Sequence, residues 1–131
     1  ILGADIPKVA LKVSPKVFDA INNGILSGNI LSCHDVSEGG VISAVSEMCF
    51  GGDCGAIIYK NSEKILFNET SGVFVVEVES EKIAKQLFRK VPFKVIGKTQ
   101  SDKTLEVEKL FKVSIDNLKM VWKKPFKEIF S

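Results

Sequence analysis

The stretch from residue 30 to residue 52 limits what this chain can fold into more than any other part of the sequence. It begins with the apolar run ILSCH, continues through DVSEGG, and then carries apolar residues at helical spacing in VISAVSEMCF until Gly51-Gly52. A short apolar run is typical of a buried strand, and the pair Gly39-Gly40 favours a tight turn before the helical pattern. The sequence therefore predicts a strand, a glycine turn and a helix in direct succession.

The rest of the chain alternates between strand and helix patterns with short connections. Ser14-Pro15 predicts an N-cap and first helical turn, Gly28 the end of that helix, and Ser80 the cap of another helix that closes before Pro92. Residues 93–99 and 104–108 are predicted to form a hairpin, and a last helix is expected to run from residue 115 to a tail that contains Pro125. The remaining expectations are strands at 8–13, 54–59 and 73–78 and a helical turn at 62–67.

This order of elements predicts an α+β fold, because the strands are not regularly separated by helices. We expect a layered domain with a mostly antiparallel or mixed sheet and helices packed on it. The 131 residues, 45% of them hydrophobic and 26% charged, suit one globular domain spanning residues 1–131. The chain opens at Ile1 as if already inside an element, so we expect a piece of a larger protein.

Charge and hydropathy argue against nucleic acid and membranes as partners. The net charge is +2 and the lysines are scattered, which argues against a nucleic-acid surface or a membrane surface. No apolar run approaches the roughly 18 residues of a membrane span, and no basic segment leads into a signal-peptide core. A cytoplasmic location is therefore expected.

The adjacent residues Cys33, His34 and Asp35 suggest metal or nucleophile chemistry at first sight. On a strand, however, Cys33 and Asp35 share one face and His34 points to the other. A zinc site needs about four ligands, and a nucleophile must lie within hydrogen-bond reach of its base. We therefore predict no catalytic and no metal-binding residue here. Cys33, Cys49 and Cys54 form no C-x-x-C pair, so reduced thiols are expected.

The second half of the glycine-rich stretch suggests an anion site. Asp35, Ser37, Gly39 and Gly40 lie where unsatisfied backbone N–H groups gather at the start of a helix. Gly39 and Gly40 would let a phosphate approach the backbone, while Ser37 could donate to the anion and Asp35 could orient the loop. Glu38 would compete for the same helix dipole. The alternative is a well-capped helix start with no ligand, and these residues alone leave both readings open.

Longer segments resemble a known family. SCHDVSEGGVISAVSEMCFGG is similar to the A-H-D-V-S-D-G-G-L-A-V-A-L-A-E-M motif in the carboxy-terminal domain of phosphoribosylformylglycinamidine synthase, the ATP-dependent amidoligase of purine biosynthesis. LFNETSGVFVVEV resembles its L-F-S-E-x-x-x-R/G-F-V-V-E-V segment, and SIDNLKMVWKKPF its closing S-L-E-E-L-x-x-x-W. With ILGADIPKV, GAIIY and VIGKT also similar, the resemblance covers nearly all 131 residues in order. It implies a fold like the carboxy-terminal domain of aminoimidazole ribonucleotide synthetase.

The resemblance implies a function for a larger protein. That enzyme makes formylglycinamidine ribonucleotide from formylglycinamide ribonucleotide, ATP and glutamine-derived ammonia, and it uses Mg²⁺. The implied partners are an ATP-binding domain upstream in the full chain, a glutaminase subunit and a small bridging subunit. This segment would be the last domain, mainly structural or on the phosphate or nucleotide side, and inactive when isolated.

The resemblance also adds one candidate binding residue. The family's substrate-contacting E-S-Q segment belongs to the first of its two carboxy-type domains, whereas this chain resembles the second. The corresponding segment here is Glu69-Thr70-Ser71, followed by Gly72 where many relatives of the shorter form have arginine. Glu69 therefore joins Asp35, Ser37, Gly39 and Gly40 as a candidate for phosphate or nucleotide binding. Packing roles are expected for His34 and Trp122.

Two other functions remain open at this point. One is another ATP-using enzyme of the same superfamily, of the selenophosphate synthetase, thiamine-monophosphate kinase or hydrogenase maturation type. The other is a ligand-sensing module without catalysis.

Overall fold

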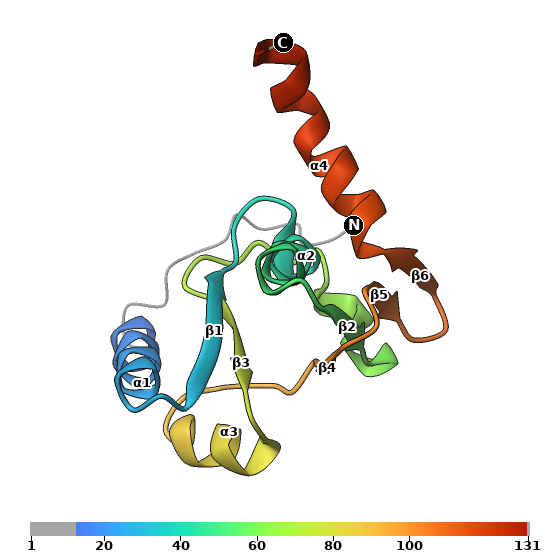
Figure 1. Cartoon of the computed structure of the whole chain (residues 1–131). Coiled ribbons are helices and arrows are strands. Elements are labelled where there is room, and N and C mark those ends of the chain that lie inside the picture. Colours follow the sequence, from blue (N-terminus) through green and yellow to red (C-terminus); the bar gives the residue numbers. More distant parts are fainter. Residues whose placement is uncertain (1–12, 131) are drawn as a thin grey trace. The chain divides into compact units, whose positions relative to one another are not determined.

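The computed structural model describes residues 13–130 (Figure 1). The strand predicted at residues 8–13 lies outside them, except for Val13. The helices are α1 (Ser14–Leu26), α2 (Gly40–Gly52), α3 (Glu81–Leu87) and α4 (Ile115–Phe130), with the 3-10 helix η1 (Lys60–Ile65). The strands are β1 (Ile30–Asp35), β2 (Gly55–Ile58), β3 (Phe74–Val78), β4 (Gly97–Gln100), β5 (Thr104–Val107) and β6 (Phe111–Ser114).

The strands form two sheets. The first is the antiparallel pair β1–β3, and the second has the order β4-β2-β5-β6, in which β2 and β5 run parallel and the other neighbours antiparallel. The described residues divide into two compact units, one up to Ala44 together with Ile65–Val95, the other comprising Val45–Lys64 and the chain from Ile96 onward. Helices with mixed and antiparallel sheets confirm the predicted α+β class.

In the first unit, α1 and α3 pack against the β1–β3 pair (Figure 1). Their shared core is built around Ile21 of α1, Ile30 of β1, Ala84 of α3 and Phe88 just after it. Gly24 lets α1 approach β1 closely, because a Cβ there would lie 2.6 Å from the Ile30 side chain. A two-stranded sheet is only marginally stable alone, so these two helices supply the apolar cover that holds it.

Helix boundaries follow the predicted signals in part. Ser80 caps α3 by accepting a hydrogen bond from the Ile83 N–H at 3.4 Å, as predicted. Ser14 does not cap α1, because Val13 holds the N-cap position in helical conformation and Ser14 is the first helical residue. Gly28, with φ of 71°, follows the C-cap of α1 and confirms the predicted stop.

Two helix ends differ from the prediction. The helix that the sequence predicts to close just before Pro92, α3, already ends at Leu87. α4 does not stop before Pro125 but continues through it to Phe130. Proline lacks an N–H and so removes one hydrogen bond from the helix, to the carbonyl of Val121. Both Val121 and Pro125 are exposed, so water can satisfy that carbonyl and the helix can continue.

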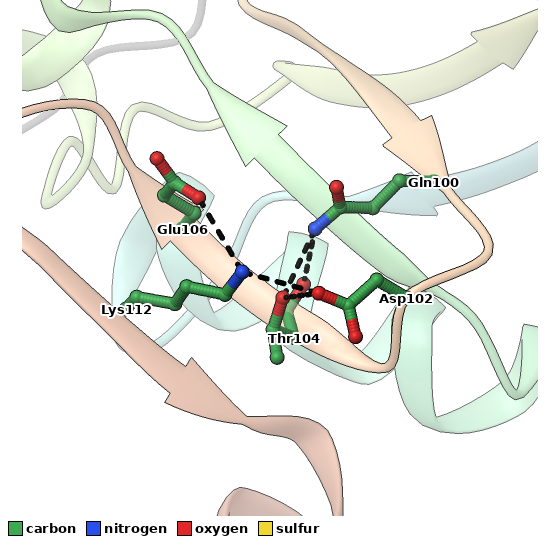
Figure 2. Close-up of polar contacts among 5 residues, drawn as sticks. All are labelled: Gln100, Asp102, Thr104, Glu106 and Lys112. Carbon is green, nitrogen blue, oxygen red and sulfur yellow. Dashed lines mark hydrogen bonds and ion pairs between the residues drawn. The ribbon is translucent and has the colours of Figure 1, made fainter.

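The predicted hairpin of residues 93–99 with 104–108 is wrong. β4 and β5 do not pair with each other, because β2 lies between them and bonds to both. Side chains nevertheless tie the connecting turn together (Figure 2): the Gln100 amide donates to the Thr104 carbonyl at 3.2 Å and to its hydroxyl at 3.1 Å. Periodicity in nearby residues cannot reveal a central strand that comes some forty positions earlier in the chain.

An ionic cluster at the surface connects this turn to β6 (Figure 2). The Lys112 ammonium lies 3.1 Å from an Asp102 carboxylate oxygen and 3.9 Å from Glu106. Hydrogen bonds from Lys112 and then from the Thr104 hydroxyl lower the pKa of Asp102. The cluster thus links the turn after β4 to β6, on a surface where ion pairs contribute little stability individually.

In the second unit, α4 is attached to the end of α2. The Lys119 ammonium donates to the Phe50 carbonyl at 3.0 Å, and the rings of Phe50 and Trp122 lie 5.6 Å apart. Ile115, the first residue of α4, is 1% exposed. Within residues 13–130, no helix combines the length and apolar character that crossing a membrane would require.

Replacing Gly55 by alanine should destabilise the second unit. Its Cβ would collide with the carbonyl oxygens of Asp102 and Thr104 and lie 2.7 Å from the Thr104 nitrogen, all of them backbone atoms. We expect a loss of about 1–3 kcal/mol or more in urea unfolding followed by fluorescence of Trp122, the only tryptophan. Gly51→Ala is the matched control: its Cβ meets nothing within 4 Å, so it should be neutral or stabilise by about 0.5–1 kcal/mol. Equal stability of the two variants would contradict the packing described for β2.

Candidate functional site

The glycine turn lies between β1 and α2, where the sequence predicts it. The N–H of Val36, just after β1, donates to the Val73 carbonyl at 2.9 Å, which ties the end of β1 to the start of β3. The following turn is closed by the Gly40 N–H, which donates to the Ser37 carbonyl at 3.0 Å. Asp35, Ser37 and Gly39 are exposed, whereas Gly40 is buried.

Glu69 is brought to the same place by the segment that precedes β3. The Gly39 N–H donates to a Glu69 carboxylate oxygen at 2.9 Å. The Ile42 N–H, in the first turn of α2, donates to the Leu66 carbonyl at 2.9 Å. Residues 66–69 therefore satisfy two of the amides that the start of a helix leaves without intrahelical partners, and the Glu69 carboxylate is a favourable charge there.

The two glycines have a structural reason to be glycine. Gly39 and Gly40 have φ of 81° and 72°, in the left-handed region that favours glycine. A Cβ on Gly40 would lie 2.7 Å from the Phe67 carbonyl carbon and 2.8 Å from the Leu66 oxygen, while one on Gly39 would collide with the Ser43 hydroxyl. The fold requires both glycines whether or not an anion binds.

The site brings together all five residues that the sequence singles out: Asp35, Ser37, Gly39, Gly40 and Glu69. The position occupied by a phosphate in the predicted arrangement, against the Gly39 N–H, holds the Glu69 carboxylate. Glu38 adds another exposed carboxylate to the turn. An incoming anion would have to displace Glu69 and overcome repulsion from the other carboxylates.

The neighbouring strand end offers little chemistry of its own. Cys33 and Asp35 are exposed and His34 is half-buried, as strand alternation predicts. His34 Nδ1 lies 2.6 Å from the Asp35 carbonyl oxygen. Partial burial of the sulfur, and then the Asp35 charge, raise the pKa of the Cys33 thiol, which lowers the fraction present as thiolate. Across residues 13–130, no three or more His, Cys, Asp and Glu side chains converge as the ligands of a metal would.

The backbone conformation after Glu69 explains why position 72 is glycine. The Thr70 N–H donates to the Asn68 side chain at 2.9 Å, and Gly72 then adopts φ of 78°. A side chain at this position would be strained, so the backbone here suits glycine rather than arginine.

Sequence reasoning missed Leu66 and Phe67, whose backbone packs on α2. The available signal was the glycine pair itself, because adjacent glycines at a helix start can mark the close approach of another backbone.

Gly40→Ala should destabilise the first unit more than Gly72→Ala. The two positions have similar positive φ, so each substitution carries the same backbone strain of about 1–2 kcal/mol. Only Gly40 adds a collision with backbone, whereas a Cβ at Gly72 would meet the Ser14 hydroxyl at 3.2 Å. Chemical denaturation of both variants, without phosphate, checks the difference. Equal losses would mean that the backbone of residues 66–67 does not pack on the turn in solution.

Known proteins share this fold and sequence pattern. Residues 3–109 match the family described as AIR synthase related protein, C-terminal domain. The PurL subunit of phosphoribosylformylglycinamidine synthase from Rhodospirillum rubrum is 33% identical over 103 residues, covering 73% of this chain and 14% of that protein. The PurL subunit from Pelagibacter ubique is 34% identical over 117 residues, covering 78% of this chain and 16% of that protein. The chain thus spans less than a fifth of the length of these relatives.

Solved structures agree on the fold. Thermotoga maritima PurL complexed with FGAR has a TM-score of 0.67 at 21% identity, covering 80% of this chain and 20% of that one. The same protein complexed with ATP has a TM-score of 0.66 at 22% identity, covering 79% of this chain and 21% of that one. The PurLQS structure from Thermotoga maritima gives 0.67 at 21% identity, with coverage of 78% and 21%. A chain of a HypE–HypF complex has a TM-score of 0.54 at 18% identity, covering 75% of this chain and 39% of that one.

These findings confirm the resemblance to the carboxy-terminal domain of the synthase. The two sequence relatives described above are PurL subunits, and the fold neighbours include PurL structures. The family match alone covers most of the chain, from residue 3 to residue 109. The chain belongs to the AIR synthase related proteins, as a C-terminal domain of that family.

Proposed function

We propose that this chain works as the last domain of a phosphoribosylformylglycinamidine synthase. The larger protein would convert formylglycinamide ribonucleotide, ATP and glutamine-derived ammonia to formylglycinamidine ribonucleotide in purine biosynthesis. The observation that carries the proposal is the match to PurL subunits over more than 70% of the chain. The family match runs through segments of both compact units, which supports treating residues 1–131 as one domain.

The cofactors of the proposed enzyme are ATP and Mg²⁺. A PurL of the same fold has been solved in complex with ATP, which supports a nucleotide in the full enzyme. The resemblance implies that the metal-binding residues lie largely in the ATP-binding domains. We therefore assign Mg²⁺ to the ATP-binding domain proposed upstream, and we derive no step through the metal here.

The proposed partners follow the division of labour in such a synthase. They are the upstream ATP-binding domain, a glutaminase subunit that supplies ammonia, and a small bridging subunit, all in the cytoplasm. The solved PurLQS structure supports a synthase of several components. A hydrogenase maturation type of enzyme is the alternative, which a shared fold with HypE–HypF supports, whereas the sequence relatives reported above are synthase subunits.

Within that enzyme, this domain would be mainly structural or would help to bind the phosphate or nucleotide. The candidate residues are Asp35, Ser37, Gly39, Gly40 and Glu69. An anion would take the Gly39 N–H from Glu69, with the Ser37 hydroxyl as a second donor. One helix N-terminus contributes about 0.3–2 kcal/mol, and millimolar affinity requires about 4 kcal/mol. The isolated domain should therefore bind phosphate weakly, and the upstream domain would supply the remaining contacts.

The isolated 131-residue chain should have no synthase activity, because phosphoryl transfer depends on positioned phosphates and Mg²⁺. The measurement is ADP formation with formylglycinamide ribonucleotide, ATP, Mg²⁺ and ammonium, compared with a mock preparation. The longer protein that contains this chain should turn over under the same conditions. Turnover by the isolated chain would overturn the proposed division of labour, and no turnover by the longer protein would overturn the synthase assignment.

Glu69→Gln should strengthen phosphate binding at the turn. The substitution removes the carboxylate charge that competes with the anion for the Gly39 N–H. Phosphate titration followed by amide NMR should give larger shifts at residues 37–41 in Glu69→Gln than in the unsubstituted chain. Glu38→Gln removes an equal charge from the same exposed turn and should have the smaller effect. Shifts outside this turn, or an equal effect of both variants, would contradict an anion site at the Gly39 N–H.

A further inference from the structure

The turn that ends α2 has a geometry that brings two cysteines together. The Cys54 N–H donates to the Cys49 carbonyl at 3.4 Å, and Asp53 between them has φ of 50°. A bond from the sixth residue back to the first, with a left-handed residue just before the end, is the Schellman motif that terminates many helices. In that motif the side chains of the first and last residues commonly pack against each other. Cys49 and Cys54 hold those two positions.

The backbone distances permit a disulfide between them. Covalent geometry places an oxygen about 2.4 Å from its own Cα and a nitrogen about 1.5 Å from its own. Adding the 3.4 Å bond gives about 7 Å for a straight path between the two Cα atoms. Because the path bends at the oxygen and at the nitrogen, the two Cα atoms lie closer than this upper limit, so the range of about 4.4–6.8 Å that disulfides span is accessible.

The two thiols differ in exposure. Cys49 is 3% exposed, while Cys54 is half-buried. The Cys54 sulfur lies 3.2 Å from the position that a Cβ on Gly52 would take, so it is directed toward the end of α2. Cys54 is therefore the thiol that a reagent can reach, and Cys49 is sheltered beside it.

We infer that Cys49 and Cys54 form a redox-sensitive pair that a small disulfide, of the glutathione type, converts to an intramolecular disulfide. The Cys54 thiolate attacks one sulfur of the oxidant, forming a mixed disulfide and releasing one thiolate. The Cys49 thiolate then attacks the Cys54 sulfur and releases the second. Each cysteine thiol loses its proton, two protein thiols are oxidised, and the oxidant leaves as two thiols. In a reducing compartment such a pair would be transient and would report oxidative conditions.

The disulfide would lock a turn on which several contacts converge. The Lys103 ammonium donates a hydrogen bond to the Asp53 carboxylate and forms an ion pair with it, at 2.6 Å. The Phe50 carbonyl accepts from Lys119, and the Phe50 ring contacts Trp122 of α4. Oxidation should therefore hold the end of α2 against fraying and slow hydrogen exchange at residues 50–54. Trp122 fluorescence reports whether α4 stays attached.

The experiment uses the 131-residue chain with Cys33→Ser, which leaves only the pair. The folded protein is equilibrated in a series of reduced and oxidised glutathione mixtures, quenched, denatured and alkylated with N-ethylmaleimide, and its intact mass is measured. We expect a product that has lost two hydrogen atoms and carries no alkyl group. The ratio of squared reduced glutathione to oxidised glutathione at which half of the chain is oxidised should be at least about tenfold higher for the folded chain than for the same chain in denaturant. Peptide mapping of the unsubstituted chain should find residues 49 and 54 joined and residue 33 alkylated.

The control is Cys54→Ser in the Cys33→Ser background, with unchanged Trp122 fluorescence as the test of folding. It should retain one alkylatable thiol, Cys49, at every glutathione ratio. A stable glutathione adduct on Cys54 with Cys49 still alkylatable would overturn the proposal, and so would equal midpoints for the folded and denatured chains. A disulfide to Cys33 in the unsubstituted chain would overturn it as well.

Discussion

The contact on which the first unit depends is the packing of the backbone of residues 66–69 against the start of α2. Two amides of the helix start, those of Gly39 and Ile42, find acceptors on this segment. Ile42 is half-buried, and buried backbone groups need a partner, whereas Gly39 is exposed. The close approach that makes the Ile42 bond possible leaves no room for a side chain at Gly40. The same segment leads into β3, which pairs with the strand that enters the turn. The glycine turn, the sheet and Glu69 are thus parts of one arrangement.

Much of the fold was predictable because its signals are local. The strand, glycine turn and helix at residues 30–52, and the cap at Ser80, are encoded by neighbouring residues. The errors arose where a distant partner decides. β2 separates β4 from β5, which no pattern near residue 100 can indicate. α4 continues through Pro125 because its solvent-exposed surface tolerates the lost hydrogen bond, a matter of environment rather than propensity.

The candidate site was likewise predictable where neighbouring residues encode it and unpredictable where a distant residue decides. The sequence identified the glycine turn, and a family resemblance added Glu69. Neither indicated that Glu69 accepts the Gly39 N–H, because a hydrogen bond across thirty positions depends on tertiary packing. The proposed redox pair of Cys49 and Cys54 could not be predicted for a related reason. Their separation matches no redox motif, and the left-handed Asp53 turns the chain back so that the Cys54 N–H reaches the Cys49 carbonyl.

The backbone contact at Gly40 bears on how related sequences should be read. If the turn once held a phosphate and a lineage stopped using it, selection for folding alone would keep both glycines. The glycine pair is then a marker of descent and architecture, and it carries no information about whether binding was retained. The side chain at position 69 is under no such steric restriction, since Glu69 is exposed and contributes only its carboxylate to the turn. Evolutionary loss or gain of an anion in this domain should therefore be visible at position 69 before it is visible in the glycines.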